Sequence, residues 1–182
     1  LQVTGADTSV AAGDYAEFSQ QIEAQNLQSL GYGTSSAKTI TLSFHCKSNK
    51  TGQYSVSINK ADSTSFVFAK SFTIDSADTW EKKTITITPD SNITSGSGAI
   101  ANDNGIGFYV FWNLMLGSNF TGATDNAWSS NSSHLSPTGH VNWMDSTSNN
   151  FYITGVQLEI GKATEFEHES YEATLLKSSR YY

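Results

Sequence analysis

The sequence lacks the features that would tie it to a membrane, a nucleic acid or a cysteine-based site. Cys46 is the only cysteine in 182 residues, so neither an internal disulfide nor a cysteine-based zinc site can form. No apolar run approaches the roughly 18 residues of a transmembrane helix, and no signal peptide is visible. Lysine and arginine number 10 against 17 acidic residues, with no basic cluster. We therefore expect no nucleic-acid partner and no membrane insertion.

Charged residues are also scarce, at 15%, and Ser, Thr, Asn and Gly take their place. Aromatic residues nevertheless make up 12% of the chain. They supply the apolar area that a folded core requires and that disordered Ser/Thr tracts lack. The length suits one domain over 1–182. Because the chain starts at Leu1 and stops on Tyr182 without an end signal, we expect it to be a segment of a longer protein.

Alternation of apolar and polar residues is the main structural pattern, and it predicts strands. In the segment 39–47 the apolar residues are predicted to face inward: Ile40, Leu42, Phe44 and Cys46. The polar residues of the same segment are predicted to face outward: Thr41, Ser43 and His45. Similar runs follow at 54–58, 66–74, 85–87, 106–114 and 151–160. Turn-forming residues separate the runs, so the pattern indicates an all-β protein folded as an antiparallel β-sandwich.

Two irregularities accompany these strands. The alternation changes phase at Thr154-Gly155, which predicts a β-bulge with Gly155 as the extra residue. One or two short helices are also expected, over 22–30 and 171–178. In the second, Ser170 is placed to cap the helix N-terminus and Glu172 to favour the helix dipole.

The last third of the chain carries the most informative motif. Gln157-Leu158-Glu159 ends a predicted strand, Phe166-Glu167-His168 lies in a charged connector, and Arg180-Tyr181-Tyr182 closes the chain. Earlier segments read KTITLSF over 38–44 and TWEKKTITI over 79–87. Together, these motifs resemble those of jelly-roll domains in tailed-phage tail-fibre and other virion structural proteins.

The resemblance implies a jelly-roll form of the sandwich and a place on a phage particle surface, in the tail or a capsid appendage. Because the family brings no catalytic signature, we expect a non-enzymatic protein without a cofactor, although a structural Ca²⁺ held by loop carbonyls stays open. By analogy with fibre proteins we expect a homotrimer whose partners are other virion proteins.

The irregular segment 117–150 is long enough to be functional. Trp rings stack on the C–H faces of sugars, while Asn, Asp and His side chains hydrogen-bond their hydroxyls. We therefore predict a site for bacterial surface glycan made of Trp128, Trp143, Asp125, Asn126, His140 and Asp145. The alternative is that both tryptophans pin the segment to the sandwich.

Other chemistry has less sequence support. Glycoside hydrolysis needs two carboxyl groups roughly 5–9.5 Å apart. The candidates Asp103, Asp125 and Asp145 all lie in Asn/Gly/Ser-rich turns, where Asp is ordinary turn chemistry. The four histidines show no zinc-binding spacing, so no metal site is predicted.

The charged connector and the closing residues form a second candidate surface. Aromatic residues and Arg dominate protein interfaces, which predicts contacts through Phe166, His168, Tyr171, Arg180 and Tyr181. The alternative is a tail that packs on its own sandwich. Two functions follow: a tail-fibre or appendage domain that aids adsorption through host glycan, or a capsid or baseplate decoration domain that binds only viral protein. A depolymerase is a third hypothesis.

Overall fold

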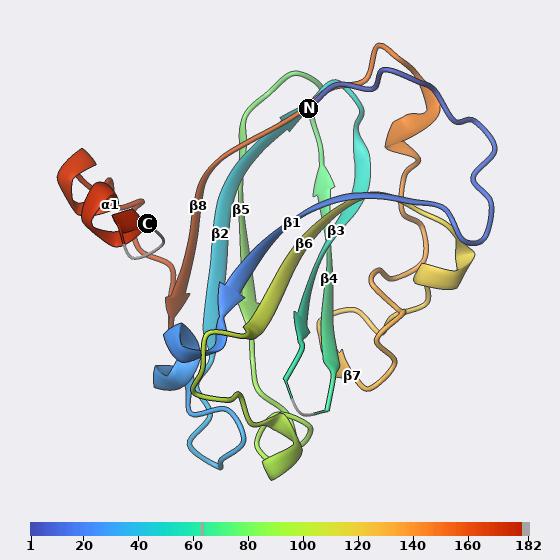
Figure 1. The fold of residues 1–182 in the computed structure, drawn as a ribbon. Helices are drawn as coiled ribbons and strands as arrows, with labels where there is room; N and C mark the ends of the chain where they lie inside the picture. Colours follow the sequence, from blue (N-terminus) through green and yellow to red (C-terminus); the bar gives the residue numbers. More distant parts are fainter. Residues whose placement is uncertain (63, 180–182) are drawn as a thin grey trace.

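Eight antiparallel strands form two facing sheets in the computed structural model, which describes residues 1–62 and 64–179 (Figure 1). The strands are β1 (Tyr15–Glu23), β2 (Ile40–Ser48), β3 (Gly52–Lys60), β4 (Phe66–Ile74), β5 (Glu81–Ile87), β6 (Ile106–Leu116), β7 (Ala127–Ser129) and β8 (Phe151–Ile160). Short 3-10 helices lie at η1 (Ala24–Leu30), η2 (Gly96–Gly98), η3 (Ser118–Phe120) and η4 (Trp143–Asp145), and one α-helix, α1, spans Tyr171–Ser178. The predicted all-β antiparallel sandwich is confirmed.

The order of strands identifies the sandwich as a jelly roll. One sheet has the order β1-β6-β3-β4-β7 and the other β5-β2-β8. Successive strands alternate between the sheets, apart from the β3–β4 hairpin and the short β7. Gln2 bridges Asn150 beside the start of β8, and the Val3 N–H donates to the Asn149 carbonyl at 3.1 Å. The N-terminal residues thus take the place of the first of eight jelly-roll strands, and β7 is an addition at the sheet edge.

The core lies between the sheets and follows the predicted alternation. Ile40, Leu42, Phe44 and Cys46 are all buried. Burial raises the pKa of the Cys46 thiol to about 11, so this thiol is protonated at neutral pH. The Trp112 ring stacks on Phe18 with centroids 5.1 Å apart and meets the edge of Phe44 at 5.9 Å.

The outer side of β2 differs from the prediction. Thr41 and Ser43 are buried, although their parity places them on the face opposite the core. β2 is the central strand of its sheet, so Thr41 and Ser43 lie between threonines on β5 and the longer Glu159 and Gln157 on β8. Thr41 also donates to the Gly161 carbonyl beyond the end of β8. The position between two neighbouring strands therefore outweighs the polar character of these residues.

Both predicted irregularities near the C-terminus are confirmed. The β2–β8 register shifts between Ser43 and His45, which face Gln157 and Thr154, and Gly155 takes the left-handed conformation with φ 58°. The Ser170 hydroxyl accepts from the Ala173 N–H at 3.3 Å and caps α1.

The helix expected over 22–30 is shorter and of a different type. Ile22 belongs to β1, and only the residues of η1 are helical, in the 3-10 form. The turn ends at Gly31, whose left-handed backbone closes it.

Candidate functional site

The long segment after β6 is fixed to the sandwich through two groups of contacts, and the predicted glycan residues lie in them. In the first group, Asp125 accepts from the Ser71 backbone N–H at 2.8 Å and hydroxyl at 3.0 Å, and pairs with Lys70. Desolvation raises the pKa of Asp125, but the contacts with Lys70 and Ser71 outweigh it and hold this pKa below its usual range. Asn126 has a left-handed backbone, φ 62°, and donates to the Ala69 carbonyl at 2.8 Å. Both residues therefore dock the segment on β4.

Trp128 completes this first group from inside the core. The residue is only 5% exposed, and its indole N–H donates to the Thr88 carbonyl at 3.2 Å. Its ring lies 5.6 Å from the Phe68 ring and 6.1 Å from the Tyr32 ring, centroid to centroid. The indole is thus a packing element of the sandwich.

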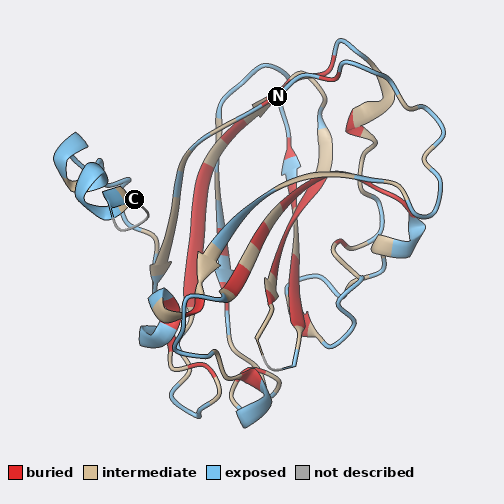
Figure 2. Cartoon of the chain, viewed as in Figure 1, coloured by how far each residue is buried: buried red, intermediate tan, exposed pale blue. Residues whose placement is uncertain are grey.

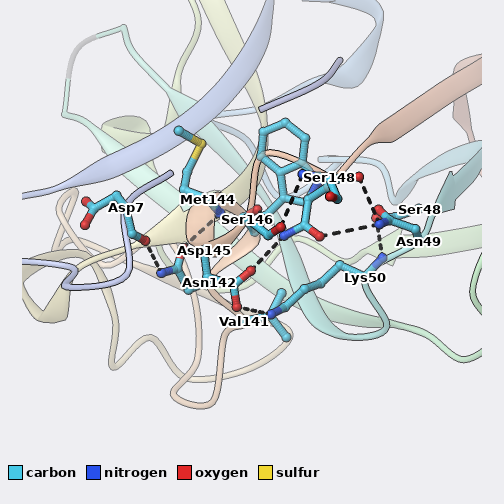
Figure 3. A network of polar contacts seen from close by, with 12 residues as sticks. Asp7, Ser48, Asn49, Lys50, Val141, Asn142, Met144, Asp145, Ser146 and Ser148 are labelled. Carbon is cyan, nitrogen blue, oxygen red and sulfur yellow. Dashed lines mark hydrogen bonds and ion pairs between the residues drawn. The ribbon is translucent and has the colours of Figure 1, made fainter. Parts of the chain in front are cut away.

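The second group joins the end of the segment to the β2–β3 turn and to the N-terminal region (Figure 3). Asp145 pairs with Lys50 and accepts from the Asn149 amide at 2.7 Å. The Lys50 ammonium holds the pKa of Asp145 below its usual range. Asn142 donates to the Asp7 carbonyl at 2.7 Å. These contacts connect parts of the chain that are far apart in sequence.

Trp143 and His140 belong to the same group. Trp143 is 4% exposed, and its indole N–H donates to the Asn150 carbonyl at 3.1 Å. The two ring nitrogens of His140 lie 2.8 Å from the Val141 carbonyl and 2.9 Å from the Asn113 carbonyl. Both ring nitrogens therefore face backbone carbonyls of the protein, and a neutral imidazole can donate to only one of the two.

The structure thus divides the predicted glycan residues between two anchors instead of gathering them around one opening. The fold follows the alternative in which both tryptophans pin the segment. Glycan contact at this segment stays a prediction, and stacking of a sugar on either indole would require that indole to leave the position described above.

The C-terminal connector between β8 and α1 (residues 161–170) is clamped to the outer face of β8 by Gln157 and Glu159 of the Gln-Leu-Glu motif. Glu159 accepts from the Thr164 backbone N–H at 3.0 Å and hydroxyl at 2.6 Å. The Gln157 amide accepts from the Glu167 N–H at 2.9 Å and donates to the Glu165 carbonyl at 3.4 Å. The motif that carries the family resemblance therefore has a physical role, which is to hold the connector against the sheet.

Phe166 lies over the bulge of β8. A Cβ at Gly155 would lie 3.8 Å from the Phe166 ring and 3.3 Å from the Nδ1 atom of His45. The Phe166 and His168 rings meet edge to face, with centroids 4.8 Å apart. Phe166 nevertheless keeps 40% of its surface exposed, so the ring contacts the bulge without being buried by it.

A hollow of about 520 Å³ lies between β8, the connector and α1. Its apolar lining comes from Val156, Leu158 and Phe166, and Glu159 and Glu167 add carboxylates. The hollow therefore combines apolar and acidic side chains.

Helix α1 stands off the sandwich beside β8, and none of its residues is buried (Figures 1 and 2). Tyr171, Leu175 and Leu176 are all exposed. A helix of eight residues is marginal in water without tertiary packing. We call the surface formed by β8, the connector and α1 the C-terminal surface. The predicted interface residues Phe166, His168 and Tyr171 lie on it, whereas Arg180 and Tyr181 lie outside the described residues.

Sequence reasoning missed Leu175 and Leu176 as members of this surface. Adjacent leucines in a short helix indicate that at least one of them is exposed, because neighbouring positions point about 100° apart and one packed face covers only one of them fully.

The remaining candidate carboxylates each have structural partners in the part of the chain that the structure describes. Asp103 accepts from the Gly105 N–H at 2.9 Å, as in an ordinary Asx turn. Asp125 and Asp145 are both occupied by lysines and amides. No cluster of three or more His, Cys, Asp or Glu side chains suited to a metal occurs within 1–62 and 64–179.

The described residues also contain no helix with the length and apolar character needed to cross a membrane. No family model, no curated protein and no solved structure matches this chain. The description of the fold and of the C-terminal surface therefore depends on the geometry of this chain alone.

Proposed function

We propose that this chain is a non-enzymatic attachment domain on the surface of a phage particle, and that its C-terminal surface binds another protein of the particle. The observation that carries the proposal is the exposure of apolar residues along α1 and the connector. Hydrogen bonds to β8 hold the connector in place beside them. The resemblance of the Gln-Leu-Glu and connector motifs to virion jelly rolls supports the phage setting.

The charges on the C-terminal surface indicate the chemistry of the partner. Glu165, Glu167, Glu169 and Glu172 are exposed around the apolar residues, and only Glu169 has a lysine partner, Lys177, among the described residues. A partner with a basic rim and an apolar centre complements this arrangement. A second copy complements it poorly, because two acidic surfaces on chains of net charge −7 repel each other.

Incorporation into particles tests the proposal. In a phage that encodes this chain, we expect Leu175→Ser/Leu176→Ser to lower the amount of chain per purified particle about tenfold, since the substitutions remove apolar area that the partner would bury. The control Tyr15→Ser removes another exposed aromatic residue, on β1, and should incorporate normally. Equal incorporation of the α1 variant and the wild type would show that this surface is not the attachment site. Purified particles without the wild-type chain would refute the virion role itself.

The homotrimer expected from fibre proteins has a separate test. Light scattering on the isolated chain should give the mass of one copy if the C-terminal surface is reserved for a different protein. A mass of three copies that falls to one in Leu175→Ser/Leu176→Ser would identify a second copy as the occupant.

A further inference from the structure

Two of the exposed aromatic residues lie side by side on the outer face of the three-stranded sheet. Tyr152 of β8 pairs in register with Lys47 of β2. The β2–β5 register pairs Cys46 with Glu81, so Trp80, the next residue, lies beside Lys47 on its other side. Trp80 is 47% and Tyr152 46% exposed, unlike the buried Trp128 and Trp143. We call Trp80, Lys47 and Tyr152 the aromatic row.

The lysine of the aromatic row lies over both rings. The Lys47 ammonium is 4.8 Å from the Tyr152 centroid and 5.5 Å from the Trp80 centroid. The two rings are 6.4 Å apart and inclined at 62°. The row is therefore a pair of inclined aromatic faces with a cation held between them.

The cation is not matched by a carboxylate of the same chain. Among residues 1–62 and 64–179, no carboxylate oxygen lies within 4.0 Å of the ammonium of Lys47 or of Lys82. Lys82 pairs with His45 across β5 and β2, in the position next to the aromatic row on the same face. By contrast, Lys50, Lys70, Lys83 and Lys177 all have acidic partners. Lys82 interacts at longer range with the Glu159 carboxylate, so Lys47 is the cation of this row without an ion-pair partner among the described residues.

Exposed aromatic rings and the unpaired Lys47 ammonium together favour one class of ligand. Aromatic faces stack on the C–H faces of pyranose rings, and an ammonium group binds a carboxylate through charge-assisted hydrogen bonds. We propose that the aromatic row binds an acidic saccharide, with a sugar ring on Trp80 and its carboxylate on Lys47.

This site is independent of the proposed attachment role. Tyr152 lies near the start of β8, whereas Gln157 and Glu159 clamp the connector farther along the same strand. A particle protein could therefore occupy the C-terminal surface while the aromatic row remains open. Loss of one interaction does not require loss of the other.

Titration of the full chain with short acidic saccharides tests the site. The probes are tetragalacturonate and a sialylated trisaccharide, and fully methyl-esterified tetragalacturonate is the uncharged match of the first. We expect saturable shifts of the Trp80 indole N–H signal in an NMR titration with at least one acidic probe. Binding should weaken at high salt, because the charges are exposed.

Variants assign the interaction to individual residues. Trp80→Ala should weaken binding of the acidic probe at least tenfold, and Tyr15→Ala, which removes an exposed aromatic residue on β1, should not change it. Lys47→Met keeps an unbranched apolar side chain over the rings and should bind the acid about as weakly as the wild type binds the ester. Backbone NMR spectra of each variant verify the fold.

Three results would overturn the proposal. The first is no saturable binding of either acidic probe up to roughly 10 mM, the weak end of specific affinity. The second is wild-type affinity in Trp80→Ala. The third is equal affinity for tetragalacturonate and its ester, which would remove the acidic ligand class.

Discussion

Lys60 shows how one residue can follow the strand pattern and yet need long-range contacts to be tolerated. It shares the inward parity of Tyr54, Val56 and Ile58 at the end of β3 and is fully buried. Its ammonium donates to the carbonyls of Asp62, Ser97 and Ala99. Since all three acceptors would lose a charged donor, we expect Lys60→Met to lower the free energy of unfolding by about 3 kcal/mol, as measured by urea denaturation.

The matched control for this prediction is Lys162→Met, which removes an exposed lysine. Exposed substitutions usually change stability by less than about 0.5 kcal/mol. A similar small change in Lys60→Met would mean that water satisfies the three carbonyls as well as the ammonium does.

His140 gives the fold a dependence on pH. Partial burial lowers the pKa of its imidazole below 6.5, and the hydrogen bonds to the Val141 and Asn113 carbonyls only partly oppose this. As the pH falls below 6.5, the unfolded chain therefore binds a proton at this residue more readily than the folded chain. The free energy of unfolding should fall toward acid, by at most about 1.4 kcal/mol per pH unit for one proton, until the pH reaches the folded-state pKa.

Urea denaturation across this pH range, comparing wild type with His140→Gln, isolates the effect. The variant should have a flatter profile than the wild type. A wild-type slope that His140→Gln leaves unchanged would assign the pH dependence to other groups.

At the scale of elements, local rules predicted more of this protein than long-range ones. The α1 cap and the β8 bulge depend on residues close together in sequence, so both were predictable. The anchors of the long segment join Lys50 to Asp145 and Asp7 to Asn142, and no local pattern reveals such pairs. The burial of Trp128 and Trp143, and the exposure of Trp80, depend on these packing relations and could not be read from the sequence.

The bulge of β8 gives a test at this scale. Gly155 has φ 58°, which disfavours a side chain, and a Cβ there would approach the Nδ1 atom of His45 at 3.3 Å. We expect Gly155→Ala to lower the free energy of unfolding by about 1–2 kcal/mol. Gly5→Ala, where a Cβ would meet nothing within 4 Å, is the control. An equal effect of the two substitutions would show that β8 accommodates the Cβ by shifting its register.

The long segment gives a second test. Replacing a buried Trp by Ala typically costs about 3–5 kcal/mol, and small proteins have only about 5–15 kcal/mol of stability. Trp128→Ala/Trp143→Ala should therefore unfold at a much lower temperature than the wild type, as followed by circular dichroism. Trp80→Ala, at an exposed position, should melt within a few degrees of it. Normal melting of the double variant would show that the two indoles contribute little to the core, and would return them as glycan-binding candidates.

At the scale of the whole molecule, the chain divides into a sandwich held by long-range pairs and an arm held by few contacts. In the sandwich, the first residues of the chain pair with residues beside the start of β8, the last strand. The arm beyond Gly161 depends on Gln157 and Glu159 for the connector, and α1 buries none of its residues. Local unfolding should therefore begin at α1.

Limited proteolysis of the full chain tests this division. Trypsin should cut first after Lys177 of α1, and glutamyl endopeptidase after Glu169 or Glu172, because protease access follows local opening. The clamp should delay cuts after Glu165 and Glu167. Mass spectrometry over time identifies the order of cleavage, and the trimmed product should keep the melting temperature of the sandwich, because the core lies between the sheets. The segment 117–150 contains no Lys, Arg or Glu, so chymotrypsin, which can cut after Phe120 and Trp128, provides the comparison. Early chymotryptic cleavage within this segment would mean that its two anchors open more readily than the arm.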